Sequence, residues 1–160
     1  MAPSATRATD ANPHPPPPSL STPPSLAVTA NASVLGSLTI PGRPEHVCEA
    51  RSFVEKSLGD ANSVTDVAVL LASETVTNAV LHSNSRRPGG TVTITVVLVG
   101  SGTRIEVTDQ GSDLSMPVVK GHGCVSGGHG LFLVQTLADQ WGYVRDELGT
   151  TVWFFLPGAA

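Results

Sequence analysis

The chain has 160 residues, of which 40% are hydrophobic and 14% are charged, and its formal net charge is −4. This length suits one domain with a proper hydrophobic core. The acidic balance provides no electrostatic footprint for nucleic acid or for an anionic membrane, and the aromatic content of 4% argues against a stacking platform for single-stranded nucleic acid.

The cysteine content and the distribution of apolar residues indicate a compartment. The two cysteines, Cys48 and Cys124, do not make a disulfide framework. Cys48 lies in a helical pattern, where we expect a small core residue, and Cys124 lies in a glycine-rich loop. The chain has no run of about 18 apolar residues and no basic segment followed by an apolar one at its N-terminus. We therefore expect a cytoplasmic protein.

The N-terminal segment is proline-rich. Residues 1–25 contain eight of the thirteen prolines, including the run Pro15–Pro18. Such a segment cannot bury enough apolar surface to offset the entropy cost of ordering it. We predict a disordered, partly polyproline tail over residues 1–25 and a folded domain over residues 26–157. Docking of the proline run on a partner is an alternative role for the tail.

The folded part opens with a strand and a helix. Residues 33–40 alternate loosely and predict a strand that ends at the Pro-Gly pair after them. Pro44 suits the first turn of a helix that runs to Leu58 and is closed by Gly59. The buried stripe of this helix is predicted to consist of Val47, Ala50, Val54 and Leu58.

The second helix carries the most informative pattern. Ser63 predicts a capping-box-like start, and the helix is predicted to run to Ser83. Glu74, Asn78 and His82 recur every four residues and therefore share one face. A carboxylate and an amide on a rigid helix can orient a hydrated Mg2+ and a nearby nucleophile. We predict the working centre here, although a solvated helix face is the alternative when the stripe is taken alone. The opposite, apolar face is predicted to consist of Val67, Leu70, Leu71 and Val80.

Two strands and a long loop follow. Residues 91–97 alternate strictly and predict a half-buried strand, and residues 104–109 predict a second strand that pairs with it through Gly100 and Gly102. Residues 110–128 have no periodicity and contain five glycines. A loop of this length inside a compact domain is functional or mobile.

The remaining elements complete a two-layer fold. An amphipathic helix is predicted to open at the glycines before Leu131, and a closing hairpin is predicted over residues 142–145 and 151–156. The order β-α-α-β-β-loop-α-β-β predicts an α+β fold, a two-layer α/β sandwich in which a mixed, mostly antiparallel sheet has helices on one face. The apolar positions of the amphipathic helix are predicted to be Leu131, Val134, Leu137, Ala138 and Trp141.

Two glycine-containing strings point to ligand binding. Asp109 ends a strand two residues before Gly111, and a carboxylate there can accept a hydrogen bond from an exocyclic amine such as that of adenine, while the glycine leaves room for a flat ring. Gly128 and Gly130 open the last helix, where backbone N–H groups and the helix dipole favour a phosphate. Taken alone, an ordinary turn is the alternative for the first string and a hinge for the second.

The order of these pieces carries a family resemblance. E-x-x-x-N, D-x-G, a loop, G-x-G and then Gly-Thr-Thr in the final hairpin resemble the GHKL (Bergerat-fold) ATP-binding domain of histidine kinases and gyrase-type ATPases. The strings Ser-Glu-Thr-Val-Thr-Asn-Ala-Val-Leu-His, Gly-Gly-His-Gly-Leu-Phe-Leu-Val and Leu-Ala-Asp-Gln-Trp-Gly are similar to those of the stand-alone anti-sigma-factor serine/threonine kinases. The resemblance covers about residues 26–157.

The resemblance implies that the chain binds ATP and Mg2+, and it implies a role for each matching residue. Asn78 would bind Mg2+, and Glu74 would serve as the general base or orient the attacking group. Asp109 would bind the adenine amino group with help from Thr150 or Thr151, and the choice between the two threonines is open. The other nucleotide-binding residues that the resemblance implies are His82, Gly111, Lys120, Gly128, His129, Gly130 and Leu131.

The resemblance also implies a function and partners. The chain would phosphorylate a serine of an anti-sigma-factor antagonist and would bind a sigma factor, thereby controlling transcription, with no direct contact to nucleic acid or membrane. Relatives dimerise, so a homodimer is an open alternative to a monomer. Residues 112–127 would form the ATP lid, in which the basic residues are Lys120 and His122, whereas some kinases of the family carry an arginine. This departure favours an alternative function, a non-catalytic nucleotide-dependent module that sequesters a protein partner.

Overall fold

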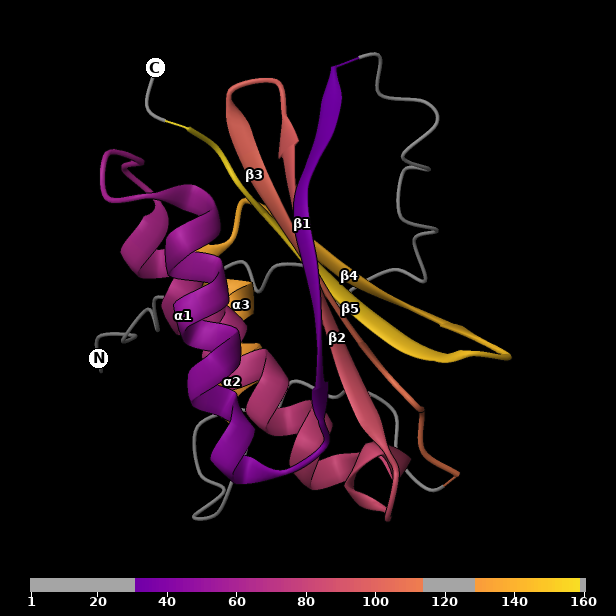
Figure 1. Ribbon diagram of the computed structural model, residues 1–160. Helices are drawn as coiled ribbons and strands as arrows, with labels where there is room; N and C mark the ends of the chain where they lie inside the picture. Colours follow the sequence, from indigo (N-terminus) through magenta and orange to yellow (C-terminus); the bar gives the residue numbers. More distant parts are fainter. Residues whose placement is uncertain (1–30, 114–128, 159–160) are drawn as a thin grey trace, which may run out of the picture.

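The computed structural model describes residues 31–113 and 129–158 of the chain (Figure 1). The predicted tail at 1–25 and the loop residues 114–128 lie outside these described residues. None of the described helices is long and apolar enough to span a membrane. The elements in chain order are β1 (Ala32–Pro41), η1 (Pro44–His46), α1 (Val47–Leu58), α2 (Thr65–His82), η2 (Asn84–Arg86), β2 (Thr91–Val99), β3 (Gly102–Asp109), α3 (His129–Leu137), β4 (Gln140–Asp146) and β5 (Gly149–Leu156).

The five strands form one sheet in the order β1-β2-β3-β5-β4, and every neighbouring pair is antiparallel. The three α-helices lie on one side of this sheet, with α2 next to both α1 and α3 (Figure 1). This arrangement confirms the predicted α+β sandwich with helices on one face. Because β5 pairs antiparallel with β3, the start of β5 lies beside the end of β3.

The core lies between the helices and the sheet. Val92, Ile94 and Val96 of β2 are fully buried and alternate with half-buried threonines, as the strict alternation predicted. On α2, Leu71 is fully buried, but Leu70 is 42% exposed, so its predicted place on the apolar face is wrong. The buried residues of α2 recur at steps of three and four residues from Ala68 onward, and that spacing turns Leu70 away from the sheet.

Different interactions set the end of α1 and the start of α2. Gly59 closes α1 as predicted, with φ at 73° and its N–H donating to the Glu55 carbonyl oxygen at 2.8 Å. The predicted capping box at Ser63 is wrong, because α2 begins at Thr65 and no side chain caps it. Instead, the Asn62 side chain accepts the Val64 N–H at 3.2 Å and so forms the turn before the helix.

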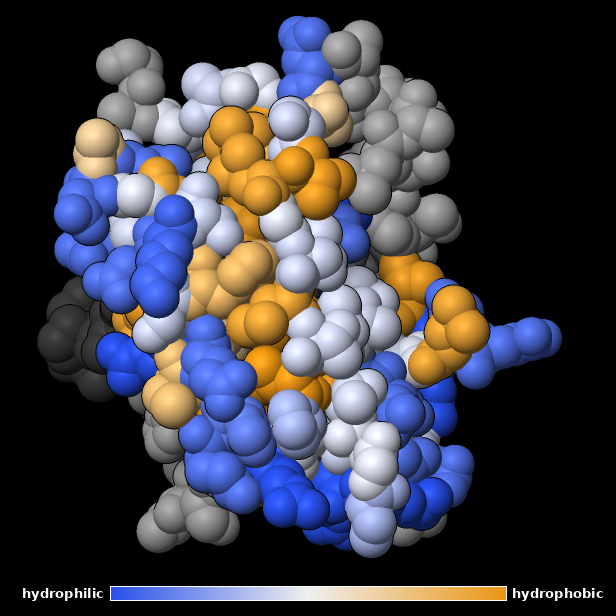
Figure 2. Space-filling view, in the orientation of Figure 1, coloured by the Kyte–Doolittle hydropathy of each residue, from blue (hydrophilic) through white to orange (hydrophobic). Residues whose placement is uncertain are grey.

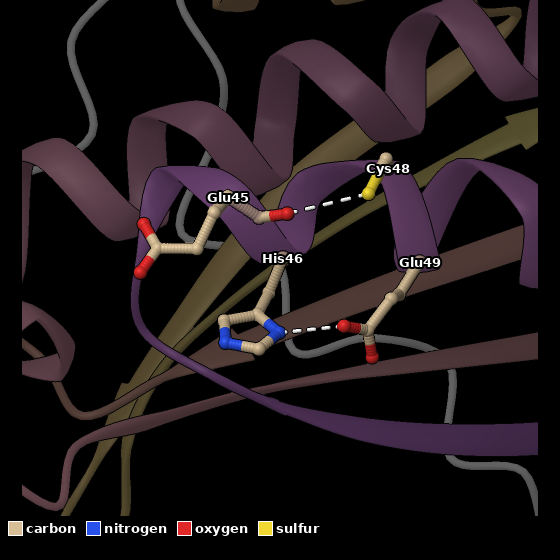
Figure 3. Close-up of polar contacts among 4 residues, drawn as sticks. All are labelled: Glu45, His46, Cys48 and Glu49. Atoms are coloured by element: carbon tan, nitrogen blue, oxygen red, sulfur yellow. Dashed lines mark hydrogen bonds and ion pairs between the residues drawn. The ribbon is translucent and has the colours of Figure 1, made fainter.

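Cys48 is exposed on α1, so the prediction of a core residue is wrong. The buried face of the helix contains Ala50, which is two residues further and therefore roughly 200° around the helix axis. The Cys48 thiol donates to the backbone oxygen of Glu45 at 3.2 Å, and Nδ1 of His46 lies 2.6 Å from Oε1 of Glu49 (Figure 3). These contacts close the first turn of the helix at the surface.

The third helix is shorter than the apolar spacing predicted. It ends at Leu137, and Trp141 lies in β4 opposite Phe154 of β5. Trp141 still packs against the core, since the strand returns it to the helix-covered face of the sheet. The apolar residues therefore keep a helical spacing beyond the end of α3, although Trp141 belongs to a strand.

The edge strand β1 presents an apolar surface together with α1. Val34 is 56% exposed and Leu35 is 40% exposed. Figure 2 shows hydrophobic side chains gathered along β1 and toward α1. A surface groove of about 490 Å³ between the two elements is lined by Leu38, Cys48, Glu49, Ser52, Phe53 and Lys56.

The neighbouring leucines of α2 provide a test of this packing. Leu71→Ala removes a fully buried side chain and should lower the free energy of unfolding by about 2–5 kcal/mol. Leu70→Ala changes an exposed side chain on the same helix and should stay within about 0.5 kcal/mol of the wild type. Urea unfolding followed by circular dichroism measures both, and equal effects of the two substitutions would contradict the assigned orientation of α2.

Candidate functional site

The N-terminus of α3 packs directly on the polar stripe of α2. A Cβ atom placed on Gly130 would lie 2.6 Å from Nδ2 of Asn78 and 3.2 Å from both Cβ and the backbone oxygen of Glu74. These separations are shorter than ordinary van der Waals contacts, so a residue without a side chain is needed for the helix to begin here. Glu74 and Asn78 are half-buried at this contact, and Gly130 is buried. The structure thus brings together two motifs that lie more than fifty residues apart in the sequence.

This contact gives the helix end a chemical environment. The first backbone N–H groups of a helix have no partner within that helix, and the helix dipole adds positive potential there. The side-chain amide nitrogen of Asn78 and the Cβ and backbone oxygen of Glu74 lie beside this positive end. The arrangement suits an anion such as a phosphate together with a hydrated cation.

Asp109 lies at the other end of the site, on the last residue of β3. Antiparallel pairing places it opposite Thr150 of β5, and Thr108 opposite Thr151. Directly opposite residues point to the same side of a sheet, so Thr150 shares the helix-covered face with Asp109. Thr151 lies on the other face, where its Oγ1 is 2.8 Å from Oγ1 of Thr108.

Two glycines make the approach of β5 to the end of β3 possible. Gly111 has φ at 70°, and its N–H donates to Oδ1 of Asp109 at 2.6 Å. Gly149 has φ at 146°, and a Cβ atom there would lie 1.7 Å from the backbone oxygen of Asp109. Side chains at these two positions would be excluded by conformation or by space. These two positions therefore place no side chain beside the Asp109 carboxylate.

Arg145 is a site residue that the sequence analysis missed. It lies on β4 opposite Thr150, so Arg145, Thr150 and Asp109 form one row across three strands. Its guanidinium donates to the backbone oxygen of Ser112. The alternation of β4, in which Trp141 and Arg145 fall on the same face, was the available signal.

The Asp109 carboxyl has a perturbed acidity. Burial raises its pKa above the ordinary value of 3.8, because a charged carboxylate loses water there. Backbone hydrogen bonds from Gly111 and Thr150 and the positive charge of Arg145 lower the pKa and partly oppose this effect.

The segment after α2 ties that helix to the Asp109 turn. Ser85 is fully buried, and its hydroxyl accepts the N–H of Gln110 at 2.9 Å. The Asn84 N–H donates to the backbone oxygen of Gly111 at 2.7 Å. Gly90 packs against the same serine, since a Cβ atom there would lie 2.1 Å from the Ser85 oxygen. The segment that follows α2 and the turn that follows β3 are thereby held together.

The other predicted site residues take varied positions. Leu131 of α3 is buried in a small cluster with Tyr143 and Val152, on the sheet face that also carries Thr150. His82 ends α2 and is exposed. His129 is the first residue of α3, whereas Lys120 and Gly128 lie outside the described residues.

The donor set at α2 fits magnesium better than a metal that needs several strong ligands. Within residues 31–113 and 129–158, no group of three or more His, Cys, Asp or Glu side chains could hold a metal ion. Magnesium prefers oxygen ligands, retains several waters and is usually shared with substrate phosphates. One amide oxygen from Asn78, with the carboxylate of Glu74 nearby, is sufficient for that kind of site.

Comparison with known proteins decides the family. Residues 40–156 match the family model of the histidine kinase-like ATPase domain. The chain belongs to this family. A solved structure of the RsbU and RsbW domains of Rv1364c from Mycobacterium tuberculosis is 20% identical, with a TM-score of 0.57, and the match covers 78% of this chain and 33% of that chain. That likeness supports the fold. No curated protein matches the chain.

The family assignment confirms the resemblance to the GHKL ATP-binding domain. The match begins at the end of β1 and continues to the last residue of β5, so it includes both halves of the site. In this histidine kinase-like ATPase domain, the Asp109 carboxylate at the end of β3 and the helix start at Gly130 lie on the same face of the sheet.

The raised pKa of Asp109 predicts a pH-dependent stability difference. Because the pKa is higher in the folded than in the unfolded chain, the folded chain binds the proton more readily. The contribution of this carboxyl is therefore favourable at low pH and is lost as pH rises through its folded-state pKa. Asp109→Asn has no titrating carboxyl at this position, so the variant does not lose this contribution to the free energy of unfolding as pH rises. The free energy of unfolding of the variant minus that of the wild type should rise with pH above 3.8 and then level off.

Urea unfolding of both proteins at a series of pH values measures this difference. The comparison cancels the titration of the remaining carboxylates, which both proteins share. A difference that falls as pH rises would contradict the assigned direction of the shift.

Proposed function

We propose that the chain binds Mg-ATP between α2, α3 and the place where the end of β3 lies beside the start of β5, and transfers the γ-phosphate to a serine of an anti-sigma-factor antagonist. The observation that carries the proposal is the contact of Gly130 with Glu74 and Asn78. It brings Glu74 and Asn78 against a helix N-terminus. Membership of the histidine kinase-like ATPase family supports ATP as the ligand, and the motifs similar to anti-sigma-factor kinases support the partner.

The adenine ring would bind at the β3 end. The Asp109 carboxylate would accept a hydrogen bond from the adenine amino group, and Gly111 would leave space for the ring. Thr150 is the better candidate to assist Asp109, because Thr151 faces the opposite side of the sheet. Leu131 would provide apolar contact on the face that Thr150 shares.

The phosphates would bind at the start of α3. Backbone N–H groups from Gly130 and its neighbours would donate to phosphate oxygens, with His129, Gly128 and Lys120 as further contacts and His82 at the margin. Asn78 would hold Mg2+ through its amide oxygen. Bound Mg2+ would neutralise phosphate charge, which phosphoryl transfer requires.

The chemical step would use Glu74. The oxygen of a serine hydroxyl forms the new bond to the γ-phosphorus as the bond to the oxygen bridging to ADP breaks, and the hydroxyl proton passes to the Glu74 carboxylate. Glu74 is one helical turn from Asn78, so base and metal ligand act on the same phosphate. Gly130 packs against the backbone of Glu74, so both residues lie beside the start of α3.

The regulatory part of the proposal follows the same resemblance. The chain would bind a sigma factor in the cytoplasm and so control transcription, with residues 26–157 as the working domain and residues 1–25 as a tail. A homodimer would use the apolar surface of β1 and α1, where Val34 and Leu35 are exposed on an edge strand.

A non-catalytic module that sequesters a partner in a nucleotide-dependent way is the second candidate. The observation that favours it is the composition of residues 112–127. The basic residues there are Lys120 and His122, and the segment contains no arginine that could bind the γ-phosphate. Both candidates share the ATP site and differ in phosphate transfer.

A variant of Glu74 separates the two. Glu74→Gln keeps the shape of the side chain but cannot accept a proton, so it should bind Mg-ATP within about twofold of the wild type. It should label serine at least about 100-fold more slowly. The assay uses γ-labelled ATP and purified anti-sigma-factor antagonist proteins from the same genome. Ser73→Ala, one position off the polar stripe, is the control and should label normally.

The outcomes distinguish the candidates. Labelling by the wild type that Glu74→Gln loses supports the kinase. ATP binding without labelling of any antagonist, combined with ATP-dependent capture of one, overturns the kinase and supports the sequestering module. Absence of Mg-ATP binding by the wild type contradicts both.

A further inference from the structure

The face of the sheet opposite the helices carries an aromatic and charged cluster. Arg104 and Glu106 of β3 and Trp153 and Phe155 of β5 alternate with core residues and therefore point away from the helices. Among residues 31–113 and 129–158, no helix or strand packs over this cluster. Figure 1 shows the three α-helices on the other side of the sheet.

The cluster is preformed. The Arg104 guanidinium carbon lies 5.1 Å from the centre of the Trp153 ring, and its Nη2 lies 2.5 Å from Oε1 of Glu106. Glycines make room for the two rings. A Cβ atom on Gly142 would lie 3.0 Å from the Trp153 ring, and one on Gly102 would lie 2.3 Å from the Phe155 ring. Two aromatic rings are thus seated on glycines of neighbouring strands.

Trp153 has an unused hydrogen-bond donor. The side chain is only 5% exposed, yet its Nε1–H has no hydrogen-bond partner in the part of the chain that the structure describes. Buried indole N–H groups are usually paired, and an unpaired one is energetically costly. This donor therefore calls for an acceptor from outside the described residues.

Polyproline has the chemistry that fits such a surface. A polyproline helix makes no internal hydrogen bonds, so its carbonyl oxygens are available to an indole N–H, and its rings pack against aromatic side chains. The chain contains such a segment. Eight prolines lie in residues 1–25, four of them in the run Pro15–Pro18.

We propose that the run Pro15–Pro18 of this chain binds across Trp153 and Phe155 on the helix-free face, with Trp153 Nε1 donating to a carbonyl oxygen of the run. The segment is long enough. Thirteen residues, 19–31, join the run to β1, and they can span about 40 Å. Three strand spacings, roughly 14 Å, separate β1 from β5.

Binding within one chain also offsets a weak affinity. A short tether provides an effective concentration on the order of millimolar, so a single hydrogen bond with ring packing is sufficient to keep the run bound. The proposal concerns the sheet face away from Asp109 and Gly130, and it does not depend on nucleotide binding.

The test follows the Trp153 indole proton in the full-length chain by two-dimensional NMR, with Trp141→Phe identifying the second indole signal. One variant changes the four prolines of the run to serine. It should shift the Trp153 indole signal and speed its hydrogen exchange about tenfold. A matched variant, which should leave both unchanged, carries serine at Pro3, Pro13, Pro23 and Pro24.

Each substitution lies in the N-terminal segment, and the dispersion of the remaining amide signals reports on folding in the same spectra. An indole signal that is identical in the wild type and in the run variant overturns the proposal. Equal changes in the run variant and the matched variant overturn it as well. A change that disappears on dilution places the run on a second copy of the chain and overturns binding within one chain.

Discussion

The site depends on the close approach of α3 to α2 at Gly130. Two helices can come this close only where one of them lacks a side chain, and here the missing side chain lies beside Asn78 and Glu74. The contact sets the distance between the helix end that attracts an anion and the side chains that would hold a cation and a proton. Gly130 therefore sets both the packing of α3 on α2 and the arrangement of the groups in the candidate site.

The second constraint is the register of β3 and β5. It places Asp109 and Thr150 on the helix-covered face, while Gly149 allows the two strand ends to touch. The buried Ser85 then links the turn after Asp109 to the segment after α2. Burial disfavours the charged carboxylate of Asp109, and the neighbouring backbone N–H groups and Arg145 limit that cost. A ligand that binds this carboxylate by a hydrogen bond would find it already oriented.

The sequence predicted what local periodicity and motif order determine, which includes the sandwich, the strand alternation and the stripe of Glu74 and Asn78. Choosing Thr150 over Thr151 required the strand register, which one sequence does not contain. Arg145 was missed because its place beside the site depends on the insertion of β5 between β3 and β4. The prediction for Cys48 was wrong because it followed the usual burial of cysteine. The rotation of α1 about its axis decides which of its residues face the sheet, and Cys48 is exposed.

The most direct test is a calorimetric titration of Mg-ATP into the wild type, Gly130→Ala and Thr136→Ala. The added methyl group of Gly130→Ala would displace the Asn78 amide, which lies 2.6 Å from its position, whereas Thr136 is an exposed residue on the same helix. The account predicts that the wild type and Thr136→Ala bind equally and that Gly130→Ala binds at least about tenfold more weakly, a loss of ~1.4 kcal/mol. Equal binding by all three proteins, or no binding by the wild type, would contradict it.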